Sequence, residues 1–159
     1  LLVDDADAVD LARARGAAAT ANVLNGVGMR LLEMSVEHAK AREQFGRPIG
    51  SFQAVKHQLA DAHVALDRAR GAAWYAALAL AEGTEDALRA ASVAKAAAND
   101  AAALLNRVAL QVHAGIGFTW EHDLHLWLKR GLALQAAWGT TAEHRAVLAG
   151  HLFEEDVDA

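Results

Sequence analysis

Three long segments of the chain repeat apolar residues at alternating steps of three and four, and this spacing most restricts how the chain can fold. Such a repeat places the apolar residues on one face of an α-helix. Alanine is the commonest residue and Pro48 is the one proline, so almost nothing in the sequence disfavours helices. No segment shows the alternation that is typical of a β-strand, and we therefore expect an all-α protein.

Glycine and proline separate the predicted helices. The first long helix should begin near Asp7 or Asp10 and end at the turn 46–48, and the second should run from Phe52 to Glu82. The residues predicted to be buried on the three long helices are, in chain order, Leu24, Val27, Leu31, Met34, His38, Ala41; Phe52, Val55, Leu59, Ala62, Leu66, Ala69, Ala73; and Ala91, Ala94, Ala98, Ala101, Leu105, Val108, Val112.

The third long helix should start after Thr84, a candidate N-cap, and end near 114–115. Two shorter helices should follow, over about 121–135 and 140–152, and the acidic tail 154–158 is expected to fray. Small alanine faces let helices approach closely, which favours near-antiparallel packing. The predicted fold is therefore an up-down helical bundle of three long helices plus two shorter C-terminal helices.

Length and composition limit the classes of protein to which the chain can belong. Its 159 residues, 54% of them hydrophobic, suit one domain with its own core. A net charge of -5 from interspersed signs does not favour nucleic acid or an anionic membrane as a partner. The sequence has no cysteine for a disulfide or a thiolate site, and no run of about 18 apolar residues or signal-peptide pattern occurs. We expect a cytoplasmic protein without a membrane span, and the start at Leu1 suggests a fragment of a longer chain.

The junction between the first two long helices contains residues that a helical bundle does not require. Arg42, Phe45 and Gln53 stand where almost any polar turn would connect two helices. Two further runs, 111–115 and 139–140, follow at matching spacing. Together these residues resemble the C-terminal helical domain of acyl-CoA dehydrogenases, and the resemblance covers essentially the whole chain.

The resemblance implies a flavoprotein that binds FAD. In it, Arg42 reaches the FAD pyrophosphate of a neighbouring subunit, since a planar and permanently charged guanidinium matches paired phosphate oxygens, and Gln53 joins it. The other residues that the resemblance places against the cofactor are Phe45, Gln111, Ala114, Gly115 and Thr140, and it places Gly139 against the substrate.

The implied activity is the α,β-dehydrogenation of an acyl-CoA thioester, in which a base removes the α-proton and the β-hydrogen leaves as hydride to the flavin. A carrier similar to electron-transfer flavoprotein then takes the electrons. The implied assembly is a homo- or hetero-oligomer. Residues 1–159 would be its C-terminal helical domain, without the N-terminal helical and β domains.

The sequence departs from the family pattern where the catalytic base is expected. Trp138 stands at the position of the usual glutamate, and the family's alternative position, twenty-six residues before Arg42, is Gly16. Ala142 replaces a common glutamine, and Ala114 replaces a glycine. Because indole has no basic lone pair with which to accept a proton, we assign no catalytic residue to this chain.

The missing base leaves three hypotheses open. The run 115–123 resembles a subgroup of bacterial members, some of which pair a base-bearing subunit with a base-lacking one. The first hypothesis is therefore a non-catalytic or cofactor-completing subunit of a heteromeric dehydrogenase. The second is an active flavoenzyme with a base elsewhere, or with different flavin chemistry such as that of a monooxygenase. The third, from another class, is a flavin-free helical interaction domain.

The sequence predicts no metal site. His122 and His125 are three residues apart on a predicted helix, but they lack the cysteines, or the paired histidines and glutamate, of a zinc site. Solvated or capping roles are expected for them. Arg42 also has an alternative role as a solvated cation at a helix C-terminus, where the helix dipole favours positive charge. Packing or surface roles are expected for the histidines His57, His63 and His113.

Overall fold

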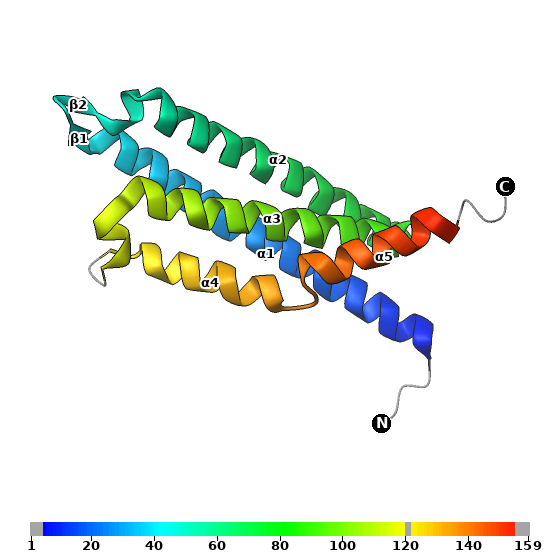
Figure 1. Cartoon of the computed structure of the whole chain (residues 1–159). Coiled ribbons are helices and arrows are strands. Elements are labelled where there is room, and N and C mark those ends of the chain that lie inside the picture. Colours follow the sequence, from blue (N-terminus) through cyan, green and yellow to red (C-terminus); the bar gives the residue numbers. More distant parts are fainter. Residues whose placement is uncertain (1–4, 120–121, 155–159) are drawn as a thin grey trace.

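The computed structural model describes residues 5–119 and 122–154, and these form five α-helices and one short hairpin. The helices are α1 (Ala6–Ala41), α2 (Gln53–Glu82), α3 (Ala87–His113), α4 (Leu124–Ala136) and α5 (Thr141–Glu154). Figure 1 shows α1, α2 and α3 side by side with alternating directions, while α4 packs against α1 and α3 and α5 packs against α3. The predicted up-down helical bundle is confirmed. Beyond residue 154, the predicted acidic tail lies outside the described residues.

Local signals fix both ends of α1. The Asp5 carboxylate accepts a hydrogen bond from the backbone N–H of Ala8 at 3.2 Å, which satisfies one of the donors that a helix N-terminus leaves free. The observed start agrees with the predicted one to within a few residues. The helix ends at Ala41, before the predicted turn at 46–48, because Arg42 already has an extended backbone with φ −78° and ψ 122°.

The junction after α1 contains a short hairpin that the sequence pattern did not predict, within a fold that is otherwise all-α. Strands β1 (Glu43–Gln44) and β2 (Arg47–Pro48) pair in antiparallel orientation. Phe45 and Gly46 make the turn between them, and both have a positive φ, 53° and 75°, as a tight two-residue hairpin turn requires. Strands of two residues are too short to show an alternating pattern, so the sequence pattern did not reveal them.

Short 3-10 helices adjoin the long helices. η1 (Ile49–Ser51) leads from the hairpin into α2, and η2 (Ala114–Phe118) follows α3. The C-cap of α2 is Gly83, whose φ of 66° is the left-handed conformation that follows the last residue of many helices. Glycine adopts this conformation without steric cost, so the predicted end of the second helix at Glu82 is confirmed.

Thr84 is not the N-cap of α3. The helix begins at Ala87 and its N-cap is Asp86, whose side chain makes no capping bond. The hydroxyls of Thr84 and Tyr75 both donate to that carboxylate, at 2.7 and 2.6 Å. The N–H of Thr84 belongs to the turn that ends α2, because it bonds to the Ala79 carbonyl at 3.1 Å. This turn moves the start of α3 beyond the predicted cap.

α3 is the central helix of the bundle, since it packs against each of the other four α-helices. Its predicted face is buried along the whole length, whereas Ala41, the last residue of the predicted α1 face, is exposed because α1 ends there. One core cluster consists almost wholly of alanines and the other contains larger side chains such as Leu31, Leu66 and Leu105. Within residues 5–119 and 122–154, no helix is both long and apolar enough to cross a membrane.

Two glycines of α1 provide a matched test of this packing. A Cβ atom at Gly28 would lie 2.7 Å from Leu105 Cδ1 and 3.1 Å from Leu66 Cδ1, whereas one at Gly26 would meet nothing within 4 Å. We predict that Gly26→Ala raises the free energy of unfolding by up to about 1 kcal/mol, the gain in helix propensity. Gly28→Ala should lower it by about 1 kcal/mol or more, because overpacking of two buried leucines outweighs that gain. Urea unfolding measures both values, and equal stabilisation by the two substitutions would contradict the close contact of α1 with α3.

Candidate functional site

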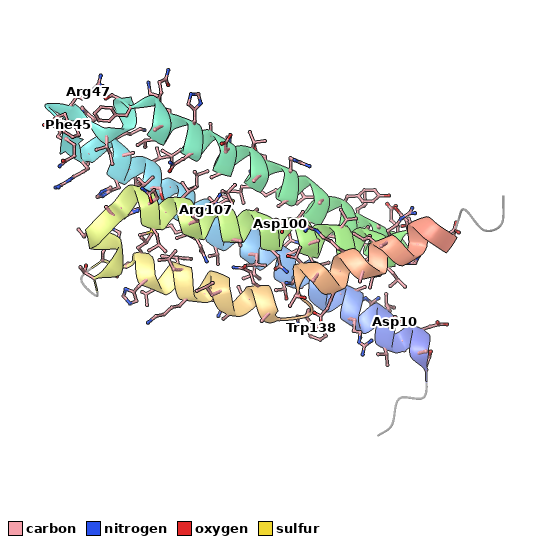
Figure 2. All side chains as sticks on the ribbon, in the orientation of Figure 1. Asp10, Phe45, Arg47, Asp100, Arg107 and Trp138 are labelled. Atoms are coloured by element: carbon pink, nitrogen blue, oxygen red, sulfur yellow. The ribbon has the colours of Figure 1, made fainter. Side chains whose placement is uncertain are left out.

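An open cavity lies at the hairpin end of the bundle, and we call it the hairpin cavity. Its volume is about 650 Å³, and the ends of α1 and α3, the hairpin and the start of α2 border it. Figure 2 shows Phe45 and Arg47 on the hairpin at this end of the molecule. Five of the seven residues predicted to contact the cofactor line the cavity: Arg42, Phe45, Gln111, Ala114 and Gly115.

The other two predicted cofactor residues are placed differently. Gln53 begins α2 and is exposed between two lining residues of the hairpin cavity, Phe52 and Ala54, without lining it itself. Thr140 precedes α5, where its N–H and hydroxyl donate to Glu143 at 2.7 and 2.9 Å and the Glu143 N–H donates back to the hydroxyl at 3.3 Å. This capping box begins α5, and it gives Thr140 a structural role that needs no ligand.

Phe45 has an exposed ring and a strained backbone, and neither stabilises the fold. It is 92% exposed, and its φ of 53° costs a non-glycine residue of order 1–3 kcal/mol. Its ring lies edge-on to Phe52 with centroids 6.2 Å apart, and the Arg47 guanidinium carbon lies 4.2 Å from the Phe52 centroid. An exposed aromatic ring held in this way is typical of a surface that a ligand or a partner covers.

The end of α3 offers main chain to the hairpin cavity. Ala114 is the C-cap of α3, with φ 51° and ψ −134°, a conformation that glycine adopts more readily than alanine. This accounts for the glycine that the family resemblance expects at position 114. A Cβ atom at Gly115 would meet nothing within 4 Å. The space beside this segment is open, so a ligand can approach its peptide groups closely.

Three histidines from different parts of the chain meet beside the hairpin cavity. The rings of His38 and His113 are stacked with centroids 4.5 Å apart, and His113 lies edge-on to His122 at 5.0 Å. Nδ1 of the buried His113 is 2.8 Å from the Ala109 carbonyl oxygen, so Nδ1 carries the proton and donates it. Nε2 of His113 is buried and has no hydrogen-bond partner within the described part of the chain.

The structure lowers the pKa of two of these histidines, His38 and His113, so both are neutral at pH 7. Burial lowers the pKa of His38, and His122 and Arg42 lower it further. Burial also lowers the pKa of His113, against the opposing effect of its bond to Ala109. Nε2 of His113 is then a hydrogen-bond acceptor. The sequence predicted a packing or surface role for His113, and the structure buries it. The sequence did not reveal the cluster, because His38, His113 and His122 come from separate segments.

The two positions at which the family resemblance expects a catalytic base lie in contact. Trp138 is in the turn between α4 and α5, and its indole ring occupies the space that a side chain at Gly16 of α1 would fill. Figure 2 shows Trp138 at this turn, beside α1 and away from Phe45. Trp138 is 55% exposed and has a φ of 59°. An aromatic ring therefore fills the place where the resemblance leads us to expect a carboxylate.

A second open cavity of about 780 Å³ adjoins this turn, and we call it the turn cavity. Trp138 and Gly139 line it, so Gly139, the predicted substrate contact, borders open space. A Cβ atom at Gly139 would lie 2.6 Å from Nε2 of His144, and the φ of Gly139 is 105°, so only glycine fits here. Two carboxylates, Asp10 and Glu143, also line the turn cavity.

Lys95 of α3 is fully buried behind the turn, and the sequence did not single it out. Its ammonium donates to Asn99 Oδ1 at 2.7 Å and to the carbonyl oxygens of Gly139 and Gln135 at 3.0 and 3.2 Å. Burial lowers the pKa of Lys95 to about 8. Position 95 follows Ala91 of the predicted buried face by four residues, and this spacing was the available signal of its burial.

A solvated or capping role was predicted for His122, and the structure shows capping, because its Nδ1 accepts the N–H of Leu124 at 3.1 Å at the start of α4. Nδ1 of His125 lies 2.9 Å from the His122 carbonyl oxygen. His57 and His63 are exposed on α2, as expected. Among the residues that the structure describes, no group of three or more histidine or acidic side chains is placed to hold a metal ion.

One helix reaches both cavities at widely separated points. Gly16, which Trp138 covers, and Arg42, at the hairpin cavity, are twenty-six residues apart in sequence. That separation corresponds to roughly 39 Å along a helix axis. The bundle therefore presents two distinct candidate surfaces, one that offers a cation and open main chain and one that offers an aromatic ring.

Comparison with protein families and known sequences gives one consistent match. The family described as "Acyl-CoA dehydrogenase, C-terminal domain" matches residues 8–153. The chain is 43% identical over 110 residues to acyl-CoA dehydrogenase IpdE2 of Mycobacterium tuberculosis, which covers 66% of this chain and 31% of that protein. The chain thus spans about a third or less of the length of this protein and of similar curated relatives.

Solved structures share the same arrangement of helices. Butyryl-CoA dehydrogenase from Megasphaera elsdenii superposes with a TM-score of 0.86 at 28% identity, over 91% of this chain and 37% of that one. A chain of the ChsE4–ChsE5 complex from Mycobacterium tuberculosis superposes with a TM-score of 0.85 at 30% identity, over 89% of this chain and 38% of that one. In each case the similarity concerns one part of a longer protein.

The buried Lys95 leads to a prediction about pH. Because folding lowers its pKa from 10.5 to about 8, the unfolded chain binds more protons than the folded chain between these values, and stability must rise with pH there. We predict that the free energy of unfolding of the wild-type chain rises relative to that of Lys95→Met from pH 8 to pH 10.5, by at most about 3 kcal/mol. Urea unfolding of both proteins across this range measures the difference. A difference that does not change with pH would contradict the burial of the ammonium.

Proposed function

The chain belongs to the acyl-CoA dehydrogenase family, and we propose from this that it is part of an FAD-dependent oxidoreductase that forms a double bond between the α and β carbons of an acyl-CoA thioester. We also propose that residues 1–159 are the C-terminal helical domain of a longer protein, since the chain matches about a third of its relatives' length. The observation that carries the proposal is the meeting of Arg42, Gln111 and the main chain at 114–115 around the hairpin cavity.

The residues around the hairpin cavity fit FAD chemically. The exposed guanidinium of Arg42 offers paired N–H donors that match pyrophosphate oxygens in charge and in geometry. The open main chain at 114–115 allows close approach of a ligand. Nε2 of His113 is buried without a partner among the described residues, and a hydroxyl or amino group of the cofactor would satisfy this acceptor. The ring of Phe45 adds exposed apolar surface.

FAD, when bound, supplies the hydride acceptor for the reaction. In our proposal the residues of this chain bind and orient it. Arg42 and Gln53 hold the phosphates, and Gln111 and the main chain at 114–115 hold the neighbouring part of the cofactor. Thr140 takes part only as an acceptor, because its hydroxyl proton is already donated within the capping box. The electrons then pass to a partner similar to electron-transfer flavoprotein.

We propose that this chain is the base-lacking subunit of a heteromeric dehydrogenase. Trp138 and Gly16 occupy the two positions where the family places its base, and neither indole nor glycine accepts a proton at neutral pH. The indole also fills the space beside Gly16. The α-proton is therefore removed in the partner subunit's own active site, and this chain contributes Arg42 across the interface.

Two features of the bundle support assembly with another subunit. Arg42 and Gly16 lie roughly 39 Å apart along α1, so we assign the residues at the hairpin cavity and those at the turn to different flavin sites, in keeping with a site shared between subunits. The outer face of α2 also exposes apolar side chains, Val64, Trp74 and Leu78. An exposed apolar face on a helical bundle suits a subunit interface.

An active enzyme with a relocated base, or with oxygenation chemistry, is the second candidate. The observation in its favour is that Asp10 and Glu143 line the turn cavity together with Trp138. Glu143 is a poor base, because the N–H and hydroxyl of Thr140 lower its pKa. Asp10 is on the exposed side of α1, where its Oδ1 lies 3.7 Å from a guanidinium nitrogen of Arg13.

The third candidate, a flavin-free interaction domain, is distinguished by the absence of flavin absorbance in the purified full-length protein.

The role of Arg42 is tested in the full-length protein. We expect Arg42→Ala to weaken FAD binding tenfold or more, because a charged hydrogen bond to phosphate contributes roughly 1.5–3 kcal/mol. The free energy of unfolding should change by less than about 0.5 kcal/mol, as for other exposed residues. Arg68→Ala, on the exposed side of α2, is the matched control and should retain flavin. Flavin absorbance after dialysis is the measurement, and equal retention by both variants would assign Arg42 to a solvated helix-end role.

The role of position 138 is tested in the heteromer. Trp138→Ala should leave the rate of acyl-CoA dehydrogenation nearly unchanged, because this residue removes no proton. Substitution of the partner's base glutamate should lower the rate on the order of 10²–10⁴-fold. Steady-state rates with an acyl-CoA and an artificial electron acceptor measure both. If the full-length protein dehydrogenates an acyl-CoA at ordinary rates when free of any partner, the subunit proposal fails, and Asp10→Asn and Glu143→Gln become the decisive variants.

A further inference from the structure

Lys95 connects α3 to both sides of the turn between α4 and α5. Each of the three N–H bonds of its ammonium has an acceptor: Asn99 Oδ1 on α3, the Gln135 carbonyl in the last turn of α4, and the Gly139 carbonyl just before α5. The side chain is 0% exposed. Residues forty and forty-four positions apart from the lysine in sequence are thus tied to one buried charge.

Core packing alone does not explain a lysine at this position. A buried ammonium loses hydration worth several kcal/mol, and an unbranched apolar side chain such as methionine would fill the same space without that cost. The C-terminus of a helix, however, leaves carbonyls without partners and carries a partial negative charge that an ammonium satisfies. Without Lys95, the Gly139 carbonyl would keep, among the described residues, only a long bond from Asn99 Nδ2, 3.4 Å. The lysine therefore stabilises the turn between α4 and α5.

The turn that Lys95 holds is strained, and it carries position 138. Trp138 and Gly139 both have a positive φ, 59° and 105°, and this conformation costs a tryptophan of order 1–3 kcal/mol. Such a backbone persists only where its surroundings fix it. The carbonyls of residues 135 and 139 flank Trp138 on both sides, and Nε2 of His144 lies 2.9 Å from the Trp138 carbonyl oxygen.

We propose that Lys95 is a positioning residue, which fixes the α4–α5 turn so that the side chain at position 138 projects onto Gly16 of α1 and forms a wall of the turn cavity. The direction of the side chain follows from the backbone of the turn, so the lysine acts on position 138 whatever residue stands there. The inference rests on the proposed function, which assigns position 138 to the place where the family puts its base.

The experiment observes the environment of Trp138 directly. The full-length protein is labelled with 5-fluorotryptophan, and the 19F resonance of Trp138 is assigned by its loss in Trp138→Phe. In Lys95→Met we expect this resonance to move and its solvent-isotope shift to rise toward that of free 5-fluorotryptophan, because the indole leaves Gly16. Asn99→Ala should cause a smaller change in the same direction. Lys56→Met, an equal loss of charge at an exposed position of α2, should cause none.

An unchanged Trp138 resonance in folded Lys95→Met would overturn the proposal, since a merely structural lysine would lower stability without moving the indole. Should Lys95→Met fail to fold, Asn99→Ala decides, and an unchanged resonance in that variant has the same meaning. Flavin content is measured in the same samples. It should be equal in the wild type and Lys95→Met, because the hairpin cavity is remote from the turn. Absence of flavin from every sample would refute the proposed function while the resonance still reports on the turn.

Discussion

The close contact between α1 and α3 is the constraint on which the rest of the fold depends. A methyl group at Gly28 would overlap Leu105, and alanines line most of the contact between these helices. Because small residues let α3 lie deep in the bundle, its remaining surface is free to receive α2, α4 and α5. The same central helix then brings its C-terminal end to the hairpin cavity and Lys95 to the α4–α5 turn. Both candidate surfaces are consequences of how far α3 is buried.

Backbone strain is concentrated at those two surfaces. Within the described residues, the non-glycine positions with a positive φ are Phe45, Ala114 and Trp138. The first two line the hairpin cavity and the third lines the turn cavity. Each conformation costs free energy that helix packing does not recover locally, and such strain is commonly found where a chain binds or reacts. The strained residues therefore identify the same two surfaces as the motif residues do, from backbone geometry alone.

The sequence predicted the features that depend on which residues of a single helix are buried. The face of α3 from Ala91 to Val112 was predicted because its spacing repeats over many turns. The hairpin escaped prediction because two-residue strands have no pattern, and the contacts of Lys95 escaped it because they depend on how distant segments pack. The last helix was predicted to start at Thr140, but the T-x-x-E capping box there was not recognised, and the side chain of Thr140 was assigned only a cofactor role. The residues of the hairpin cavity were found by resemblance, since helical periodicity says nothing about which polar side chains meet at the end of a bundle.

The contact between Trp138 and Gly16 makes the residues at these two positions depend on each other. A single change of Gly16 to glutamate would meet the indole ring, which already occupies that space. A change of Trp138 to glutamate would uncover the glycine and remove the contact of the indole ring with α1. The residue at either position therefore limits which residues the other position accepts, and the two positions are expected to change together rather than one at a time.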